Sequence, residues 1–170
     1  MVTEHKLILQ TVEKIKKEIG QIEATKVVNT HYLVTIVDFF RTYADKFHHG
    51  KEEGILFRAL SQQNLKETDQ KVMMELMMEH GVARHTVTAL DKAKEEYIAG
   101  KQDALKHILD QLSTLIKLYP AHIEKEDKHF FYPSMEYLTV QDQNDMQTSF
   151  ITFNQNFTDK KYQQVIDQLQ

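Results

Sequence analysis

Two stretches of the chain place a histidine four residues before a glutamate: His48 with Glu52, and His122 with Glu126. On an α-helix, residues four apart lie on the same face, one turn apart. Each pair can therefore offer an imidazole nitrogen and a carboxylate oxygen to one point in space. Imidazole and carboxylate ligands suit iron, manganese or zinc. We predict that the two pairs lie on two helices and hold metal between them.

The elements that must position these side chains are helices. The chain has 170 residues with only two prolines and five glycines, and its remaining composition favours helix formation. Apolar residues recur every three to four positions over about 3–22, 31–60, 69–99 and 102–132, which predicts four amphipathic helices. Short polar or weakly patterned stretches separate them. Because short loops make neighbouring helices antiparallel, we predict an all-α fold, an up-and-down antiparallel four-helix bundle.

The stretch after about residue 140 is rich in Gln, Asn and Asp, but it carries aromatic and aliphatic residues at helical intervals. We expect an additional C-terminal helix over about 140–170, packed outside the bundle. The length of the chain fits a single domain over 1–170, with the bundle at about 3–135. No internal repeat of similar residues is apparent.

Two more histidines, His5 and His80, lie on the apolar stripes of the first and third expected helices. In an antiparallel helix pair, residues at the same height are equidistant from the turn. The midpoint of His48 and His80 is residue 64, in the polar stretch 61–68, and that of His80 and His122 is residue 101, beside Gly100. The midpoint of His5 and His48 falls near residues 26 and 27, in the weakly patterned stretch 23–30. We therefore predict six metal ligands at one depth: His5, His48, Glu52, His80, His122 and Glu126.

Other polar residues compete for the site. His49 and Glu53 form a second pair, offset by one residue from His48 and Glu52 and so about 100° round an α-helix. We expect this offset pair to lie beside the ligands or to face solvent. His129 follows the last carboxylate at the Glu-x-x-His spacing of di-iron bundles, but the motif occurs once, so we expect His129 in the pocket wall. The remaining histidines are expected at the surface: His31, His85 and His107.

Composition excludes several function classes. Net charge is −4, from 21 basic and 25 acidic residues, and no basic patch is concentrated enough to predict a nucleic-acid partner. No apolar run approaches the length of roughly 18 residues that a membrane-spanning helix requires, so we expect no membrane span. The first residues lack the apolar core of a secretory signal. The absence of cysteine excludes disulfides and thiolate metal ligands, and it fits a cytoplasmic location.

These motifs resemble those of the hemerythrin-like, or HHE cation-binding, domain family. The resemblance covers about residues 4 to 135. Its motifs are Glu4-His5, the stretch 48–57, Glu79-His80 followed by Arg84, and the stretch 122–127 followed by 131–133. Any one of them alone would be weak, but together they are specific.

The resemblance implies a non-haem di-iron centre: two iron ions, Fe2+ or Fe3+, oxo- or hydroxo-bridged, with another divalent metal as the alternative. It implies binding of O2 or another small diatomic ligand such as NO, as a carrier, store or sensor. A di-iron redox enzyme with peroxidase, oxidase, nitric oxide or iron-repair activity is the other interpretation, and a binding protein is favoured over it. Arg84 stands where oxygen-carrying hemerythrins have a second histidine on the third helix, which moves weight from oxygen carriage towards sensing or redox chemistry.

Overall fold

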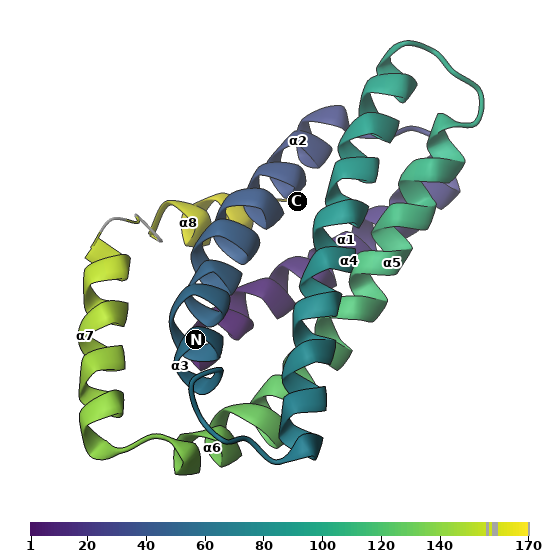
Figure 1. The fold of residues 1–170 in the computed structure, drawn as a ribbon. Helices are drawn as coiled ribbons and strands as arrows, with labels where there is room; N and C mark the ends of the chain where they lie inside the picture. The colour runs from purple at the N-terminus through teal and green to yellow at the C-terminus, as the bar shows by residue number, and fades with distance from the viewer. Residues whose placement is uncertain (156, 158–159, 170) are drawn as a thin grey trace.

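The computed structural model describes residues 1–155, 157 and 160–169, and this part of the chain contains helices and no strands (Figure 1). The first helix is α1 (Val2–Thr25). The second helical path consists of α2 (Thr30–Asp38), η1 (Phe39–His49), η2 (Glu52–Phe57) and α3 (Arg58–Leu60). The third helix is α4 (Glu67–Ile98). The fourth path consists of α5 (Ala104–Lys125), η3 (Glu126–Phe130), α6 (Phe131–Ser134) and η4 (Met135–Tyr137).

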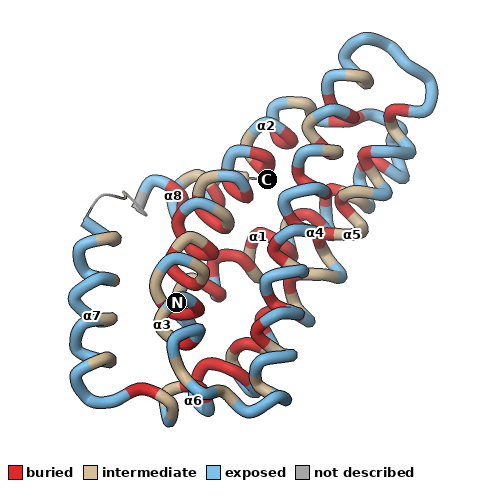
Figure 2. The backbone as a smooth tube through the Cα atoms, viewed as in Figure 1, coloured by how far each residue is buried: buried red, intermediate tan, exposed pale blue. Residues whose placement is uncertain are grey.

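These four helical segments form an antiparallel bundle, as the sequence predicted (Figure 1). α5 packs against both α1 and α4, and α2 packs against α4. Two clusters of buried apolar side chains fill the interior. Along each bundle helix, the predicted metal ligands fall between a residue of one cluster and a residue packed in or against the other, so a polar layer separates two apolar ones. The buried residues follow the inward faces of the helices in Figure 2.

The turns fall where the sequence predicted them. Asn29 caps α2, because its side-chain oxygen accepts a hydrogen bond of 3.1 Å from the backbone N–H of Tyr32. Gly100 follows α4 with a φ of 76°, a left-handed conformation that glycine adopts without a steric penalty. These turns fix the heights at which residues on neighbouring helices meet.

Three segments near the polar layer are π-helical: η1, η2 and η3. A π-helix closes hydrogen bonds from residue i to i+5, so each turn holds more residues than an α-turn and the direction of successive side chains changes. The second helical path therefore departs from α-helical phase at the level of the site. Gly50 lies between η1 and η2, and a Cβ atom there would come within 3.3 Å of the Phe153 ring.

The additional C-terminal helix is present as two helices, α7 (Val140–Gln155) and α8 (Lys160–Gln168). α8 packs against α1, and Tyr162 and Ile166 on α8 are buried in the larger apolar cluster. α7 packs against η2 and stands on the outside of the bundle (Figure 1). Residues 156, 158–159 and 170 of the expected extension lie outside the described residues. None of the described helices combines the length and apolar character needed to cross a membrane.

Candidate metal centre

The structure brings the six predicted ligands together in the polar layer. Each of them is at most 3% exposed. The Nε2 atoms of His5 and His48 lie 3.0 Å apart, and those of His80 and His122 lie 3.2 Å apart. The carboxylates of the two glutamates face these four nitrogens at 3.1–3.9 Å.

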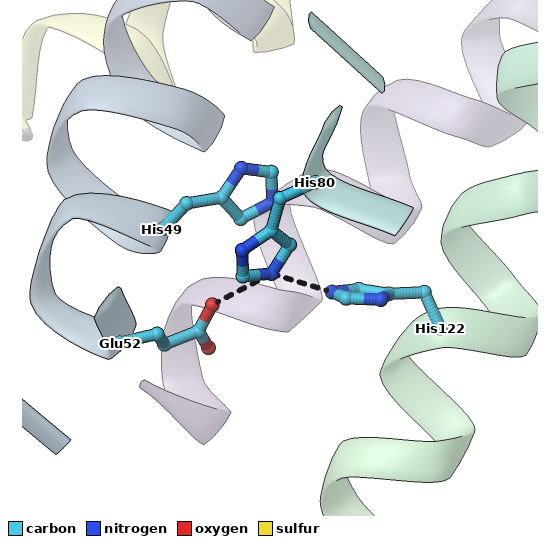
Figure 3. A group of neighbouring side chains, drawn as sticks. All are labelled: His49, Glu52, His80 and His122. Carbon is cyan, nitrogen blue, oxygen red and sulfur yellow. Dashed lines mark hydrogen bonds and ion pairs between the residues drawn. The ribbon is translucent and has the colours of Figure 1, made fainter. Parts of the chain in front are cut away.

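The side chains form two groups, each compact enough for one cation. Position A is defined by His5, His48, Glu52 and Glu126, and position B by His49, Glu52, His80 and His122 (Figure 3). Within each group the ligand atoms lie within 4.8 Å of one another. Glu52 belongs to both groups. Glu126 also reaches position B, because its Oε1 atom lies 3.3 Å from Nε2 of His122.

Each of the four predicted imidazole ligands has a carboxylate behind it. In each case the Nδ1–H group of the imidazole donates to the carboxylate. The pairs are His5 with Asp127 (3.0 Å), His48 with Glu4 (2.9 Å), His80 with Glu53 (2.7 Å) and His122 with Glu79 (2.8 Å). These bonds select the tautomer with the proton on Nδ1, so the Nε2 lone pairs face the centre. A carboxylate behind a histidine in this way is a regular feature of metal sites and makes the ligand more basic.

Cations in turn hold three of these carboxylates. Lys51, which is 1% exposed, donates to Glu4. Lys125 Nζ lies 2.7 Å from Glu79, and Arg84 Nη2 lies 2.7 Å from Glu53. Burial raises the pKa of the Glu4 carboxyl, but hydrogen bonds from His48 and Lys51 outweigh burial and hold that pKa at about 2. Burial also raises the pKa of Glu53 and of Glu79, but hydrogen bonds to an imidazole and to a cation outweigh it, so these three carboxylates are ionised at neutral pH.

The residues fit a pair of bound cations. Among the described residues, neither oxygen of Glu52 or of Glu126 has a hydrogen-bond partner, although both side chains are fully buried. Buried carboxylates without partners are unfavourable and recruit a proton or a cation. Burial and the charge of Glu126 raise the pKa of Glu52 well above its usual range. Two nitrogens bound at right angles to one metal at about 2.1 Å lie about 3.0 Å apart, close to the two observed Nε2–Nε2 distances.

The electrostatics of the imidazoles favour the form that binds metal. Burial lowers the pKa of His48 to about 4 and that of His49 to about 3, so both are neutral at neutral pH. His122 differs, because Glu126 and Glu79 outweigh burial and raise its pKa. Metal binding requires neutral imidazoles and displaces protons from them. A cation at position B would therefore compete with a proton on His122.

The sequence left open whether His49 lies beside the ligands or faces solvent, and the second alternative is wrong. His49 is 1% exposed, and its ring stacks on that of His80 with 3.8 Å between centroids. His48 and His49, neighbours at the end of η1, therefore both face the interior. Glu53 does lie beside the ligands, since it bonds to His80 and Arg84. The expected place of His129 in the pocket wall is wrong, because its side chain is exposed on the outer face of the fourth helical path and belongs to neither group. The three histidines expected at the surface are exposed.

The histidines and glutamates of the site occur twice in the chain with nearly the same spacing, although the residues between them differ. Glu4-His5 recurs 75 residues later as Glu79-His80, and His48, Glu52 and the acidic residue at 53 recur 74 residues later as His122, Glu126 and Asp127. The contacts repeat as well, because Glu4 supports His48 as Glu79 supports His122. Glu52 and Glu126 therefore occupy equivalent places, one in each of the two sets of residues. Counting positions between the histidine–glutamate pairs would have revealed this pattern.

Comparison with known families supports the same part of the chain. The family model described as hemerythrin HHE cation binding domain matches residues 1–132, a range that includes all six predicted ligands and the carboxylates behind them. No curated protein and no solved structure matches the chain.

Proposed function

The chain belongs to the hemerythrin HHE cation-binding domain family, and we propose that it binds two iron ions, at positions A and B, which take up O2 or another small diatomic ligand such as NO. Its role would be that of a carrier, store or sensor. The proposed ligands are His5, His48, Glu52, His80, His122 and Glu126. The observation that carries the proposal is the unpartnered, fully buried pair of carboxylates facing four Nε2 atoms.

The donor set suits iron, and the family to which the chain belongs makes iron the cation that we propose. Neutral imidazoles and carboxylates suit iron, manganese and zinc, and the chain contains no thiolate that would favour copper(I). Two imidazoles and two shared carboxylates leave positions of an octahedral ion open for water or a small ligand. Bound iron would supply redox chemistry and an exchangeable position for that ligand.

The chain's own contribution is to hold the nitrogens and exclude water. The ring of Phe131 stacks on His5 at 5.7 Å between centroids, and that of Phe57 stacks on His80 at 6.0 Å. Together with the apolar clusters on both sides of the polar layer, these rings make the site dry. A dry, enclosed centre strengthens the interactions of the metal with its ligands and protects it from side reactions.

A redox enzyme is the second candidate, and one observation favours it. A cavity of about 320 Å³, larger than a diatomic molecule requires, opens beside position B and is lined in part by Asp45, His49, Arg84 and Tyr119. Such a cavity could admit peroxide or a larger reductant. Turnover of peroxide or NO by the iron-loaded protein that is lost in His122→Ala would select the enzyme over the binding protein.

Metal analysis of the purified protein tests the proposal directly. We expect about two iron ions per chain after anaerobic loading with Fe2+, and a new near-ultraviolet to visible absorption band when O2 or NO is added. His122→Ala should lose the band, whereas His85→Ala, which removes an exposed histidine, should keep it. A colourless protein that holds stoichiometric zinc and takes up no iron would overturn the proposal.

A further inference from the structure

We propose that the outward face of α4 is the interface of a homodimer, in which the α4 helices of two copies pack antiparallel. The two-fold axis would pass between residues 79 and 80. This inference is independent of the metal centre, because His80, the predicted ligand on α4, is buried on the inward face of the helix.

Exposed apolar side chains are concentrated at the middle of this face. Eleven large apolar side chains are exposed in the described part of the chain, and four of them lie within residues 74–82 of α4. They are Met74, Met77, Met78 and Val82, with exposed fractions of 46–69%. Apolar residues exposed singly are ordinary, whereas a cluster of them marks an interaction surface. Methionine is also adaptable enough to fill an irregular contact.

Ion pairs border this apolar cluster on both sides of the helix. On one side, Lys125 of α5 pairs with Glu79 at 2.7 Å. On the other side, Arg84 pairs with Asp45 and with Glu53, at 2.7 Å in each case. An apolar centre within a polar rim is the usual arrangement of a protein–protein interface.

Gly81 lies in the middle of the cluster. It is exposed and lies about one turn from Met77 and Met78. A Cβ atom there would have no neighbour within 4 Å in the described chain, apart from the backbone of its own helix, so nothing in that part of the chain requires a glycine. Glycine destabilises the middle of a helix, but it allows another backbone or side chain to approach closely. A second helix packed on this face would use that space.

The residues along this face indicate that the second helix is α4 of another copy. A two-fold interface must be complementary to itself. We define the dimer face by the residues that follow one side of α4 at alternating intervals of four and three: Glu67, Lys71, Met74, Met78, Gly81, His85, Thr88 and Lys92. All of them are exposed.

An antiparallel pair about the proposed axis matches both shape and charge. Met78 then faces Gly81 of the second copy, so the larger side chain occupies the space that glycine leaves. Glu67 faces Lys92 of the second copy at each end of the contact. A parallel pair in register would instead place Glu67, Lys71 and Lys92 each against its own copy, and like charges repel.

Sedimentation equilibrium of the full chain over a range of protein concentrations tests the proposal. The wild type should associate reversibly to a dimer. Met78→Glu, a change at an exposed position, should weaken association at least about tenfold, because it places a charge in the apolar centre. Ile151→Glu, which changes an exposed apolar residue of α7, is the matched control and should associate as the wild type does.

Gly81→Leu separates the interface from the stability of the helix. Leucine favours a helix more than glycine does, so the melting temperature of the monomer should not fall. Leucine also fills the space that Met78 of the second copy requires, so association should weaken at least about tenfold. Gly20→Leu makes the same substitution at an exposed position of α1 that has open surroundings, and it should keep wild-type association.

Exchanging the end charges tests the antiparallel register. At low salt, Glu67→Lys and Lys92→Glu should each weaken association about threefold or more, and the double variant should restore it. A wild type that stays monomeric throughout would overturn the proposal, as would wild-type association in both Met78→Glu and Gly81→Leu. A double variant no tighter than either single variant would overturn the antiparallel register.

Discussion

Glu52→Gln should stabilise the metal-free protein and weaken the metal-bound one. In the absence of metal, both Glu52 oxygens are buried without a hydrogen-bond partner among the described residues, at 3.1 Å from Nε2 of His48 and 3.4 Å from Nε2 of His80. A glutamine amide carries no charge there, and its NH2 group can donate to one of these nitrogens. With metal bound, the same change removes the shared anionic ligand. The two states should therefore respond with opposite signs.

The magnitudes follow from these contacts. Leaving a buried polar group unsatisfied costs about 1–3 kcal/mol, and a change of 1 kcal/mol shifts Tm by about 2–4 °C in a chain of this size. We expect the Tm of the chelator-treated variant to rise by roughly 2–12 °C. Metal at a thousandfold excess over Kd stabilises by about 4 kcal/mol. A hundredfold weaker affinity would remove about 2.7 kcal/mol of this.

Thermal unfolding followed by circular dichroism, with chelator and with Fe2+ or Co2+ under anaerobic conditions, measures both effects. Glu126→Gln should also weaken metal binding, but it should not stabilise the metal-free protein, because His122 and His5 outweigh burial and hold the pKa of Glu126 below its usual range. Glu23→Gln, which changes an exposed glutamate, should leave both values unchanged. If Glu52→Gln lowers the Tm of the metal-free protein and leaves the metal-induced shift intact, the carboxylate is neither unsatisfied without metal nor a ligand.

Three further predictions concern residues around and beyond the ligands. Glu79→Gln should weaken metal binding by about 10–100-fold, because it removes the carboxylate that orients His122; competition with a chelator measures this. Lys51→Met should lower the free energy of unfolding by on the order of 2–4 kcal/mol, since it leaves Glu4 without its buried cation; urea titration measures this. Glu18→Gln should stabilise the protein increasingly above about pH 4.3, because burial raises the pKa of Glu18 and the folded wild type loses stability as pH rises through that pKa.

Each of these has a control or a result that would contradict it. Glu23→Gln should leave metal affinity at its wild-type value, and equal affinities for the Glu79 and Glu23 variants would show that the carboxylate behind the imidazole is dispensable. Lys16→Met, which removes an exposed lysine paired with Glu13, should cost less than about 1 kcal/mol. A stability difference between wild type and Glu18→Gln that shrinks as pH rises would reverse the sign argued for Glu18.

The sequence alone was sufficient for the bundle and for the meeting of the six side chains. Apolar periodicity depends only on helix geometry, and it located the four helical segments and their turns. Equal distances from a turn then placed His5, His48, His80 and His122 at one height, because antiparallel helices rise by the same amount per residue. Their role as metal ligands stays a prediction, which the metal-binding measurements above test.

Two features depended on tertiary structure. The carboxylate behind each imidazole lies on a different helical segment, as Glu4 and His48 show, so it is set by how the helices pack rather than by local spacing. The burial of His49 is the second feature, because the 100° between neighbours on a helix predicted that His48 would face inward and left the place of His49 open. The spacing of apolar residues predicts which side chains share one face of a regular α-helix. Only the packed structure shows where a helix departs from that ideal and which carboxylate lies behind each predicted ligand, because both depend on contacts between segments far apart in the sequence.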